Sequence, residues 1–342
     1  MSRISVVLPY RDAASTLVAA MESVLVDLGA DDELVVVDDG SSDGSTDLVH
    51  ALARRDARVV PLASSGTKEL AAGLVPTLQR GIAASRSELV GRMDADDLSL
   101  PGRFAAQRRL LERDPALGAV GTRVEVFPDP GAGMQRYVAW QNSLVSREEH
   151  AHAIFVEAPL CHPSTLLRRD ALLAVGGYVD LPWSVDYDLW LRLDAAGYGL
   201  AKVPEVLFRW RFSPTSMTWT HPRNSAARFL EARASYLARR LRDRDAVPTL
   251  VVWGAGQTGR RLARALEAHG WTTAAFVDID PRKVGRTARG APIVDAEEGI
   301  ARARRGACLL VVAVGAAGAR DVVRARLAAA GLQEGRAFVC AA

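Results

Sequence analysis

Four short apolar runs alternate with helix-forming segments in the N-terminal part of this chain, and this alternation limits the folds that it can adopt. The runs are Ile4–Leu8, Leu34–Val37, Val59–Leu62 and a fourth that begins at Leu89. Continuous apolar runs of this length are typical of strands buried on both faces of a sheet. Strands that alternate with helices predict a parallel, helix-covered sheet, so the expected fold class is α/β.

A cluster of polar residues follows the end of three of these strands. The clusters are Pro9–Asp12, Asp38–Ser41 and Asp94–Asp96. In open parallel sheets ligands bind beyond the carboxyl ends of the strands, so the three clusters are expected to form one site. Carboxylates there can accept hydrogen bonds from a base or from ribose hydroxyls, while a cation neutralises phosphate. The site therefore suits a nucleotide diphosphate.

The segment Asp94–Asp97 places three carboxylates within four positions. Asp94 and Asp96 are two residues apart, so their side chains could converge as the strand ends. Crowded carboxylates repel one another unless a cation lies between them, and Mg²⁺ or Mn²⁺ prefers such oxygen ligands. A solvated acidic turn is the alternative for an isolated motif of this kind. Arg92 and Arg103 are expected to form salt bridges with these acids.

Length and composition indicate a globular protein of more than one domain. The 342 residues exceed one ordinary core, and the 49% hydrophobic and 24% charged fractions are typical of soluble proteins. A net charge of only +3 gives no general case for nucleic-acid binding. Three widely spaced cysteines, no apolar run of about 18 residues and no signal peptide predict a cytoplasmic protein, with peripheral contact at the inner face of the membrane left open.

Three segments resemble the nucleotide-sugar half of family 2 glycosyltransferases of the GT-A fold. They are Ile4–Pro9, Val35–Thr46 and Arg92–Arg103. The resemblance implies a mostly parallel sheet with flanking helices and a nucleotide-sugar donor, with UDP as the expected nucleotide.

The resemblance also implies roles for individual acids in this half. Asp39 is expected to contact the base, and Asp94 to face the ribose or the donor sugar and to share in the metal site. Asp96 is expected to hold Mn²⁺ or Mg²⁺. The remaining residues of the implied base pocket are Pro9, Tyr10 and Asp12.

A second half is expected to bind the acceptor. In the related transferases a segment like His162-Pro163-Ser164 lies beside the acceptor, so the resemblance implies that His162, and also Trp183, contact it. The segment Asp186–Leu193 has helical spacing and is similar to the E-D-Y-D-L-W pattern whose Asp is the general base, although Val185 replaces the Glu. An acid at a helix N-terminus can also act as an N-cap, and the two roles are compatible for Asp186.

The implied reaction is displacement at an anomeric carbon with inversion of configuration. Asp186 deprotonates an acceptor hydroxyl, which attacks the face opposite the leaving nucleotide diphosphate. Arg211 is expected to contact the donor phosphates. The predicted protein is a metal-dependent inverting glycosyltransferase of surface glycan or glycoconjugate synthesis, whose acceptor is a glycan, a lipid-linked glycan or a small molecule.

The tail carries a second glycine pattern. A strand that begins at Thr249 leads into a G-x-G-x-x-G turn, and Asp278 ends the next strand, 24 positions after the first glycine. This spacing predicts a Rossmann-like unit, in which the glycines approach a pyrophosphate and the acid reaches a ribose. A tail nucleotide site would comprise Gly254, Gly256, Gly259 and Asp278.

The sequence leaves the ligand of the tail open. The tail is similar to the nucleotide-sugar-binding N-terminal domains of some bacterial sugar acetyltransferases. It could bind NAD(P) or a second sugar nucleotide, which would make the protein bifunctional, or it could be a docking or homo-oligomerisation module. The absence of a Tyr-x-x-x-Lys pair disfavours a dehydrogenase. A further alternative is a non-catalytic nucleotide-sugar-binding protein.

The predicted domain organisation has three parts. A GT-A domain occupies residues 1–224 and divides into a nucleotide-sugar half, 1–125, and an acceptor half, 126–224. A linking helix lies within 225–247. The small Rossmann-like domain occupies 248–342, with Pro248 at the boundary.

Overall fold

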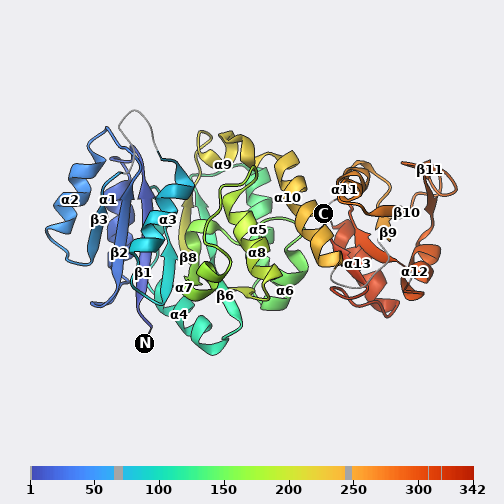
Figure 1. The fold of residues 1–342 in the computed structure, drawn as a ribbon, viewed down its shortest axis with the longest axis horizontal. Helices are drawn as coiled ribbons and strands as arrows, with labels where there is room; N and C mark the ends of the chain where they lie inside the picture. The colour runs from blue at the N-terminus through green and yellow to red at the C-terminus, as the bar shows by residue number, and fades with distance from the viewer. Residues whose placement is uncertain (1, 65–71, 243–248, 307, 317) are drawn as a thin grey trace. The chain divides into compact units, whose positions relative to one another are not determined.

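A computed structural model describes residues 2–64, 72–242, 249–306, 308–316 and 318–342 (Figure 1). The chain divides into two compact units. The N-terminal unit comprises Met1–His150, Ala158–Leu181 and Asp188–Thr220, and the C-terminal unit comprises Ala151–Glu157, Pro182–Tyr187 and His221–Ala342. The predicted boundary residue Pro248 lies outside the described residues.

An eight-stranded mixed sheet forms the centre of the N-terminal unit. Its strand order is β3-β2-β1-β4-β7-β6-β8-β5. The first four of these strands are mutually parallel, β7 is antiparallel to both of its neighbours, and β6 and β8 pair in parallel. The strands, in sheet order, are β3 Val59–Leu62, β2 Glu33–Asp38, β1 Ile4–Tyr10, β4 Leu89–Arg92, β7 Leu166–Arg168, β6 Leu117–Phe127, β8 Gly199–Arg211 and β5 Leu98–Ser99.

Helices cover both faces of this sheet, which explains why its central strands are apolar throughout. Every residue of β1 is buried. Alternate residues of β1 and β2 pack in one core with helices α1 (Leu17–Leu25) and α4 (Arg103–Arg113). Helix α3 (Leu74–Ala84) contacts β1 and β2 (Figure 1). It lies so close that a methyl group at Gly81 would overlap the side chain of Val7.

Further helices of the described residues lie between 45 and 220, and the one between the second and third apolar runs and the one that contains Asp186–Leu193 were predicted. They are α2 Ser45–Ala53, α5 Ala132–Ser143, α6 Arg147–Ala153, α7 Arg169–Ala174, α8 Val185–Ala195 and the short α9 Met217–Thr220. The mostly parallel α/β sheet with flanking helices is thus confirmed.

The C-terminal unit contains helix α10 (Ala226–Arg242) and a second sheet of order β11-β12-β10-β9-β13-β14. The first strand, β9, has the parallel strands β10 and β12 and the short antiparallel β11 on one side, and the parallel strands β13 and β14 on the other. This reversal of strand order is the switch point of a doubly wound sheet, so the Rossmann-like prediction is confirmed. The elements of the tail are β9 Thr249–Trp253, α11 Gln257–Glu267, β10 Thr272–Val277, β11 Thr287–Ala288, β12 Ala291–Val294, α12 Ala296–Arg304, β13 Leu309–Val312, α13 Ala319–Ala329 and β14 Phe338–Cys340.

Within the described ranges, each helix is too short or too polar to cross a lipid bilayer.

Candidate active site

The register of the parallel strands brings the predicted polar clusters to one edge of the sheet. Tyr10 at the end of β1 pairs with Asp38 at the end of β2, and Val7 pairs with Arg92 at the end of β4. The residues that follow each strand therefore leave the sheet at the same edge. The predicted convergence of the three clusters is confirmed, whereas the role of each side chain stays a prediction.

Hydrogen bonds join the loop after β1 to the serine-rich loop after β2. The amide of Ser42 donates to the Asp12 carboxylate at 2.7 Å, and the amide of Asp12 donates to Ser41 Oγ at 3.1 Å. The amide of Ala14 donates to the Asp43 carboxylate at 2.8 Å. Asp12 has a φ of 47°, a conformation that an aspartate tolerates better than most residues. This clasp fixes both loops, and it uses part of the hydrogen-bonding capacity of Asp12.

Asp38 and Asp39 have different environments although they are adjacent. Asp38 is buried and accepts a hydrogen bond from the amide of Ser41 at 2.9 Å. Asp39 is half-buried, and its carboxylate accepts from the amide of Gly73 at 3.0 Å. Beside them, burial raises the pKa of the buried Tyr10. Asp39 is therefore the acid of this pair with more solvent access.

The acidic cluster after β4 is partly buried and strongly coupled. Arg92 and Asp94 form a salt bridge of 2.6 Å, as predicted. Burial, followed by the negative charge of Asp94, raises the pKa of Asp96 to about 6. Asp97 is only 1% exposed, and burial together with the charges of Asp94 and Asp96 raises its pKa well above the usual range. The charges of Arg92 and Arg211 lower the pKa of Asp96, but burial and the charge of Asp94 outweigh them.

These residues fit a divalent cation bound with few protein ligands. A group of three or more His, Cys, Asp or Glu side chains arranged as a metal site is absent from the described part of the chain. Mg²⁺, however, commonly takes only one or two carboxylates and completes its shell with water and substrate phosphate. The raised pKa of Asp96 indicates that its charge is poorly compensated by the protein alone. Asp96, with Asp94 beside it, can therefore hold Mn²⁺ or Mg²⁺.

The affinity for the cation should depend on pH. A protonated carboxyl is a poor ligand, so we expect the affinity for Mn²⁺ to fall as the pH drops through the Asp96 pKa of about 6, by up to about tenfold per pH unit below it. In the absence of a cation, the raised pKa of Asp96 has the opposite pH dependence for the stability of the fold. The folded state holds the proton of Asp96 more tightly than the unfolded state does. The contribution of Asp96 to stability therefore falls as the pH rises from 3.8 to about 6. Calorimetric titration of Mn²⁺ between about pH 7 and pH 5 measures the first effect. A constant affinity over that range would contradict it.

Arg211, at the end of β8, contacts the acidic segment from the strand that pairs with β5. Its amide donates to Asp97 Oδ1 at 2.7 Å, and its Nε donates to the carbonyl oxygen of Asp96 at 2.7 Å. Its guanidinium also lies 4.5 Å from the centre of the Phe127 ring. Arg211 therefore lies beside the predicted metal ligand, and its contact with donor phosphate stays a prediction. The sequence analysis did not identify Asp97, whose position as the third acid of the motif was the only signal.

Arg103 differs from its prediction. It is fully buried, and instead of pairing with an acid it donates from Nη2 to the carbonyl oxygens of Arg92 (2.8 Å) and Pro163 (2.9 Å). The planar guanidinium carries several N–H donors in a fixed geometry, so it can reach carbonyl oxygens at the end of β4 and at the turn after Cys161 together. The expected salt bridge of Arg103 was therefore wrong. The residue fixes the end of β4 against the turn that carries His162.

His162 is held as a neutral imidazole. Its Nε2 lies 2.5 Å from the hydroxyl of Tyr178, and the rings of Tyr178 and Trp190 contact it edge-on. Burial, and then the charge of Arg92, lowers the pKa of His162 well below its ordinary value. Tyr178 was not identified from the sequence, because nothing in its spacing marks it as a partner of His162. The contact of His162 with the acceptor stays a prediction.

Asp186 belongs to the C-terminal unit and lies in the first turn of α8. The helix begins at Val185, so Asp186 lies inside it rather than at the N-cap. Its carboxylate accepts from the amide of Tyr187 at 2.8 Å and from the hydroxyl of Ser184. Tyr187 is itself anchored, since its hydroxyl donates to the carbonyl oxygen of Ile154 at 2.9 Å. These contacts orient the carboxylate rigidly. Asp186 is half-buried, and Trp183, three positions earlier in the chain, is half-buried too.

The tail forms the predicted glycine turn between β9 and α11. Gly254 has a φ of 123°, and a side chain at Gly259 would collide with the carbonyl oxygen of Gly254. Gly256 precedes the first residue of α11. Asp278 follows β10, and its carboxylate accepts from the amide of Ala255 at 3.2 Å and pairs with Lys283 at 2.9 Å. The four residues predicted for a tail site thus lie at the switch point of the second sheet.

Solved structures resemble this fold. The mannosyltransferase PcManGT of Pyrobaculum calidifontis, solved with GDP-Man and Mn²⁺, is similar over 97% of this chain and 81% of its own, with 18% identity and a TM-score of 0.50. S. aureus TarS 1-349 in complex with UDP-GlcNAc is similar over 78% of this chain and 72% of its own, with 12% identity and a TM-score of 0.56. Likenesses at such identities establish the GT-A-like fold and not the ligand.

Two curated relatives are similar in sequence. The amylovoran biosynthesis glycosyltransferase AmsE of Erwinia amylovora is 31% identical over 53% of this chain and 64% of its own length, which is less than two thirds of that relative. The UDP-Gal:alpha-D-GlcNAc-diphosphoundecaprenol beta-1,3-galactosyltransferase of Escherichia coli is 26% identical over 59% of this chain and 71% of its own.

Two family models match separate parts of the chain. The model described as CoA binding domain matches residues 248–334, within the Rossmann-like tail. The model described as glycosyl transferase family 2 matches residues 5–176, which contain the edge of the first sheet and its acidic cluster. Because the second match spans half of the sequence and agrees with the fold, the chain belongs to glycosyltransferase family 2.

Proposed function

We propose that this protein is a metal-dependent inverting glycosyltransferase that moves a sugar from a UDP-linked donor to an acceptor hydroxyl. The observation that carries the proposal is the acidic cluster at the carboxyl edge of the first sheet. Asp96 there has a pKa raised to about 6 and lies next to Asp94, while Asp39 leaves the same edge from a neighbouring strand. A sugar nucleotide offers this edge a hydrogen-bond donor for Asp39 in addition to the amide of Gly73, and phosphates that bring a cation to the acids.

In this proposal the donor is held by residues of the two clasped loops and the acidic segment. Asp39 accepts a hydrogen bond from a base N–H, and Asp94 accepts from a hydroxyl of the ribose or the sugar. Asp96 holds Mn²⁺ or Mg²⁺, which when bound would neutralise charge on the diphosphate as a Lewis acid. Arg211 directs its guanidinium to the phosphates. The walls of the base pocket are Pro9, Tyr10 and Asp12.

Asp186 is the proposed general base. Its carboxylate is oriented by the amide of Tyr187 and the hydroxyl of Ser184, and a carboxylate held in this way can accept the proton of an acceptor hydroxyl. The deprotonated oxygen attacks the anomeric carbon from the face opposite the nucleotide diphosphate, so the configuration inverts without a covalent enzyme intermediate. His162, as a neutral imidazole, and Trp183 are the proposed acceptor contacts.

The biological setting is proposed from the names of relatives. The E. coli relative is named for transfer to a diphosphoundecaprenol-linked sugar, and AmsE is named for amylovoran biosynthesis. We infer an acceptor that is part of a glycan or a lipid-linked glycan, and a place of action at the inner face of the membrane. We also propose that residues 248–342 form a separate domain that binds a nucleotide, which is supported by the CoA-binding-domain match and the glycine turn of α11.

A hydrolysis screen tests the donor proposal. Purified protein is incubated with Mn²⁺ and a panel of UDP-, GDP- and dTDP-sugars, and release of the nucleotide diphosphate is measured. We expect one UDP-sugar to be hydrolysed well above the others, because Asp39 matches the N–H group of uracil while the sugar pocket is selective. Chelation of the cation should abolish the signal. Preferential hydrolysis of a GDP-sugar would overturn the assignment of UDP, and equal activity with chelator would overturn metal dependence.

A further inference from the structure

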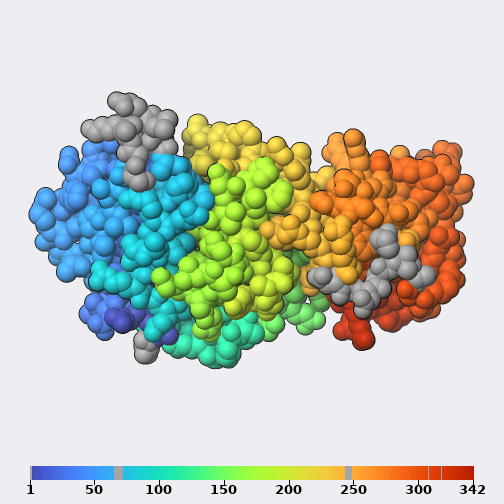
Figure 2. Space-filling model, viewed as in Figure 1, coloured from blue at the N-terminus to red at the C-terminus, as the bar shows by residue number. Residues whose placement is uncertain are grey.

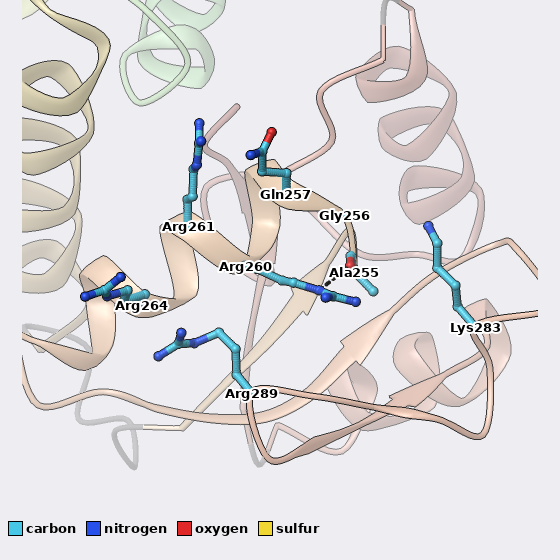
Figure 3. A pocket seen from close by; sticks show the side chains of 8 residues that line it. All are labelled: Ala255, Gly256, Gln257, Arg260, Arg261, Arg264, Lys283 and Arg289. Carbon is cyan, nitrogen blue, oxygen red and sulfur yellow. Dashed lines mark hydrogen bonds between the residues drawn. The ribbon is translucent and has the colours of Figure 1, made fainter.

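A cationic cavity lies beside helix α11 in the C-terminal unit. It has a volume of about 490 Å³, which is within the range of small-molecule sites. Figure 3 shows side chains of α11 on one side of it and Lys283 and Arg289, from the segment between β10 and β12, on the other. In Figure 2 the orange part of the chain, which includes α11, forms surface on the face shown. The lining residues are Ala255, Gly256, Gln257, Arg260, Arg261, Arg264, Lys283 and Arg289.

The cavity has more positive charge than the described residues around it neutralise. Lys283 pairs with Asp278, and Arg289 pairs with Glu267. Arg260 donates only to a backbone carbonyl, that of Ala255 at 2.8 Å. Arg261 and Arg264 are exposed, and among the described residues neither forms an ion pair. Of five cationic side chains, two are therefore paired, and an anion with several charges fits the remainder.

The acid of this fold that would ordinarily receive a ribose hydroxyl already accepts three hydrogen bonds. Asp278 Oδ1 accepts from the amide of Asp280 at 3.0 Å, while Oδ2 accepts from Ala255 and pairs with Lys283. Burial alone would raise the pKa of Asp278, but these hydrogen bonds and the lysine outweigh it and lower the pKa. The ammonium group of Lys283 lies 2.9 Å from Asp278 Oδ2, so it competes with a ribose hydroxyl for that oxygen. A phosphate on the ribose suits that ammonium better than a free hydroxyl does.

We propose that the tail cavity selects nucleotides that carry a phosphate on the ribose in addition to their diphosphate. The proposal rests on the tail being a nucleotide-binding domain and specifies its ligand class. The diphosphate lies at the N-terminus of α11, where Gly256 and Gln257 present free amides. Lys283 and Arg260 bind the ribose phosphate. Both NADP and coenzyme A have this chemistry, whereas NAD, dephospho-coenzyme A and UDP-sugars lack the additional phosphate.

Matched pairs of ligands test the proposal on the full-length protein. Calorimetry is performed with saturating UDP and Mn²⁺, so that the donor site of the first domain is occupied. We expect NADP⁺ to bind about tenfold more tightly than NAD⁺, or coenzyme A to bind about tenfold more tightly than dephospho-coenzyme A. The reason is that the additional ribose phosphate accepts charge-assisted hydrogen bonds from Lys283. The pair that binds identifies the source of the ribose phosphate.

Substitution of Lys283 separates this selection from general charge attraction. Lys283→Gln should abolish the preference within the pair and improve binding of the member without the phosphate, because Asp278 then becomes free to accept a ribose hydroxyl. Arg305→Gln, which removes an exposed arginine that does not line the cavity, should leave the preference unchanged.

The outcomes distinguish the two levels of the proposal. If both members of a pair bind equally to the unmodified protein, or if the preference survives in Lys283→Gln, the selection for ribose phosphate is wrong while the tail remains a nucleotide site. If none of the four ligands binds although UDP with Mn²⁺ does, the nucleotide-binding role of the tail is itself wrong.

Discussion

Replacing Asp186 with Asn is expected to lower the rate of sugar transfer by about 10²–10⁴-fold, the range that general-base catalysis contributes. The amide keeps the shape of the side chain and can still accept from the amide of Tyr187, but it cannot take a proton from the acceptor hydroxyl. Affinity for UDP with Mn²⁺ should stay within about threefold, because the proposed role of Asp186 concerns only the acceptor. Initial rates with the donor identified by the hydrolysis screen, together with calorimetry, measure the two quantities.

Asp170→Asn is a matched control for this substitution. Asp170 lies in the first turn of α7, is exposed, and accepts from the amide of the next residue at 2.7 Å, just as Asp186 accepts from Tyr187. The Asp170→Asn variant should transfer sugar at the same rate as the unmodified protein. If Asp186→Asn also retained the full rate, another residue would have to be the base.

Replacing Asp96 with Ala is expected to remove metal-dependent donor binding. The proposed site has few protein ligands, so loss of its main carboxylate should weaken Mn²⁺-dependent binding of UDP by about 100-fold or more. In the absence of Mn²⁺ the variant and the unmodified protein should bind UDP with similarly low affinity. Calorimetry with and without Mn²⁺ separates the two contributions.

Asp47→Ala is the control for Asp96→Ala. Asp47 is an exposed acid in the first turn of α2, and its removal changes the net charge by the same amount. We expect it to leave the Mn²⁺-dependent increase in UDP affinity intact. If Mn²⁺ increased the UDP affinity of Asp96→Ala as much as that of the unmodified protein, the cation would be held elsewhere. The proposed roles of Asp94 and Asp96 would then have to be abandoned.

The architecture of both units was predictable because it depends on patterns local to the chain. The buried strands are continuous apolar runs, such as Leu34–Val37, and each parallel strand delivers the residues after it to a known edge of the sheet. The glycine turn before α11 was predictable for a similar reason, since Gly254 and Gly259 must be glycines wherever strand and helix approach so closely.

Side-chain partners that come from distant parts of the chain could not be predicted in this way. Asp97 is held by the amide of Arg211, which is 114 positions away. Arg103 donates hydrogen bonds to two backbone carbonyl oxygens, whereas its proximity in the sequence to Asp94–Asp97 had predicted a salt bridge with an acid. Neither pairing follows from the spacing of residue types, because both depend on how the antiparallel β7 and the long β8 fit beside the parallel strands. The burial that raises the pKa of Asp96 belongs to the same class of tertiary effects.

The clasp between the first two loops has a consequence for the thermodynamics of recognition. Ser42 and Ala14 donate their amides to the acids of the opposite loop, so contacts within the protein itself order both loops. The chain therefore gives up the conformational entropy of these loops when it folds, and an incoming sugar nucleotide does not have to freeze them. Affinity can then depend on the few contacts made by the base and the diphosphate, and two loops ordered in advance can discriminate among donors that differ by a single hydroxyl.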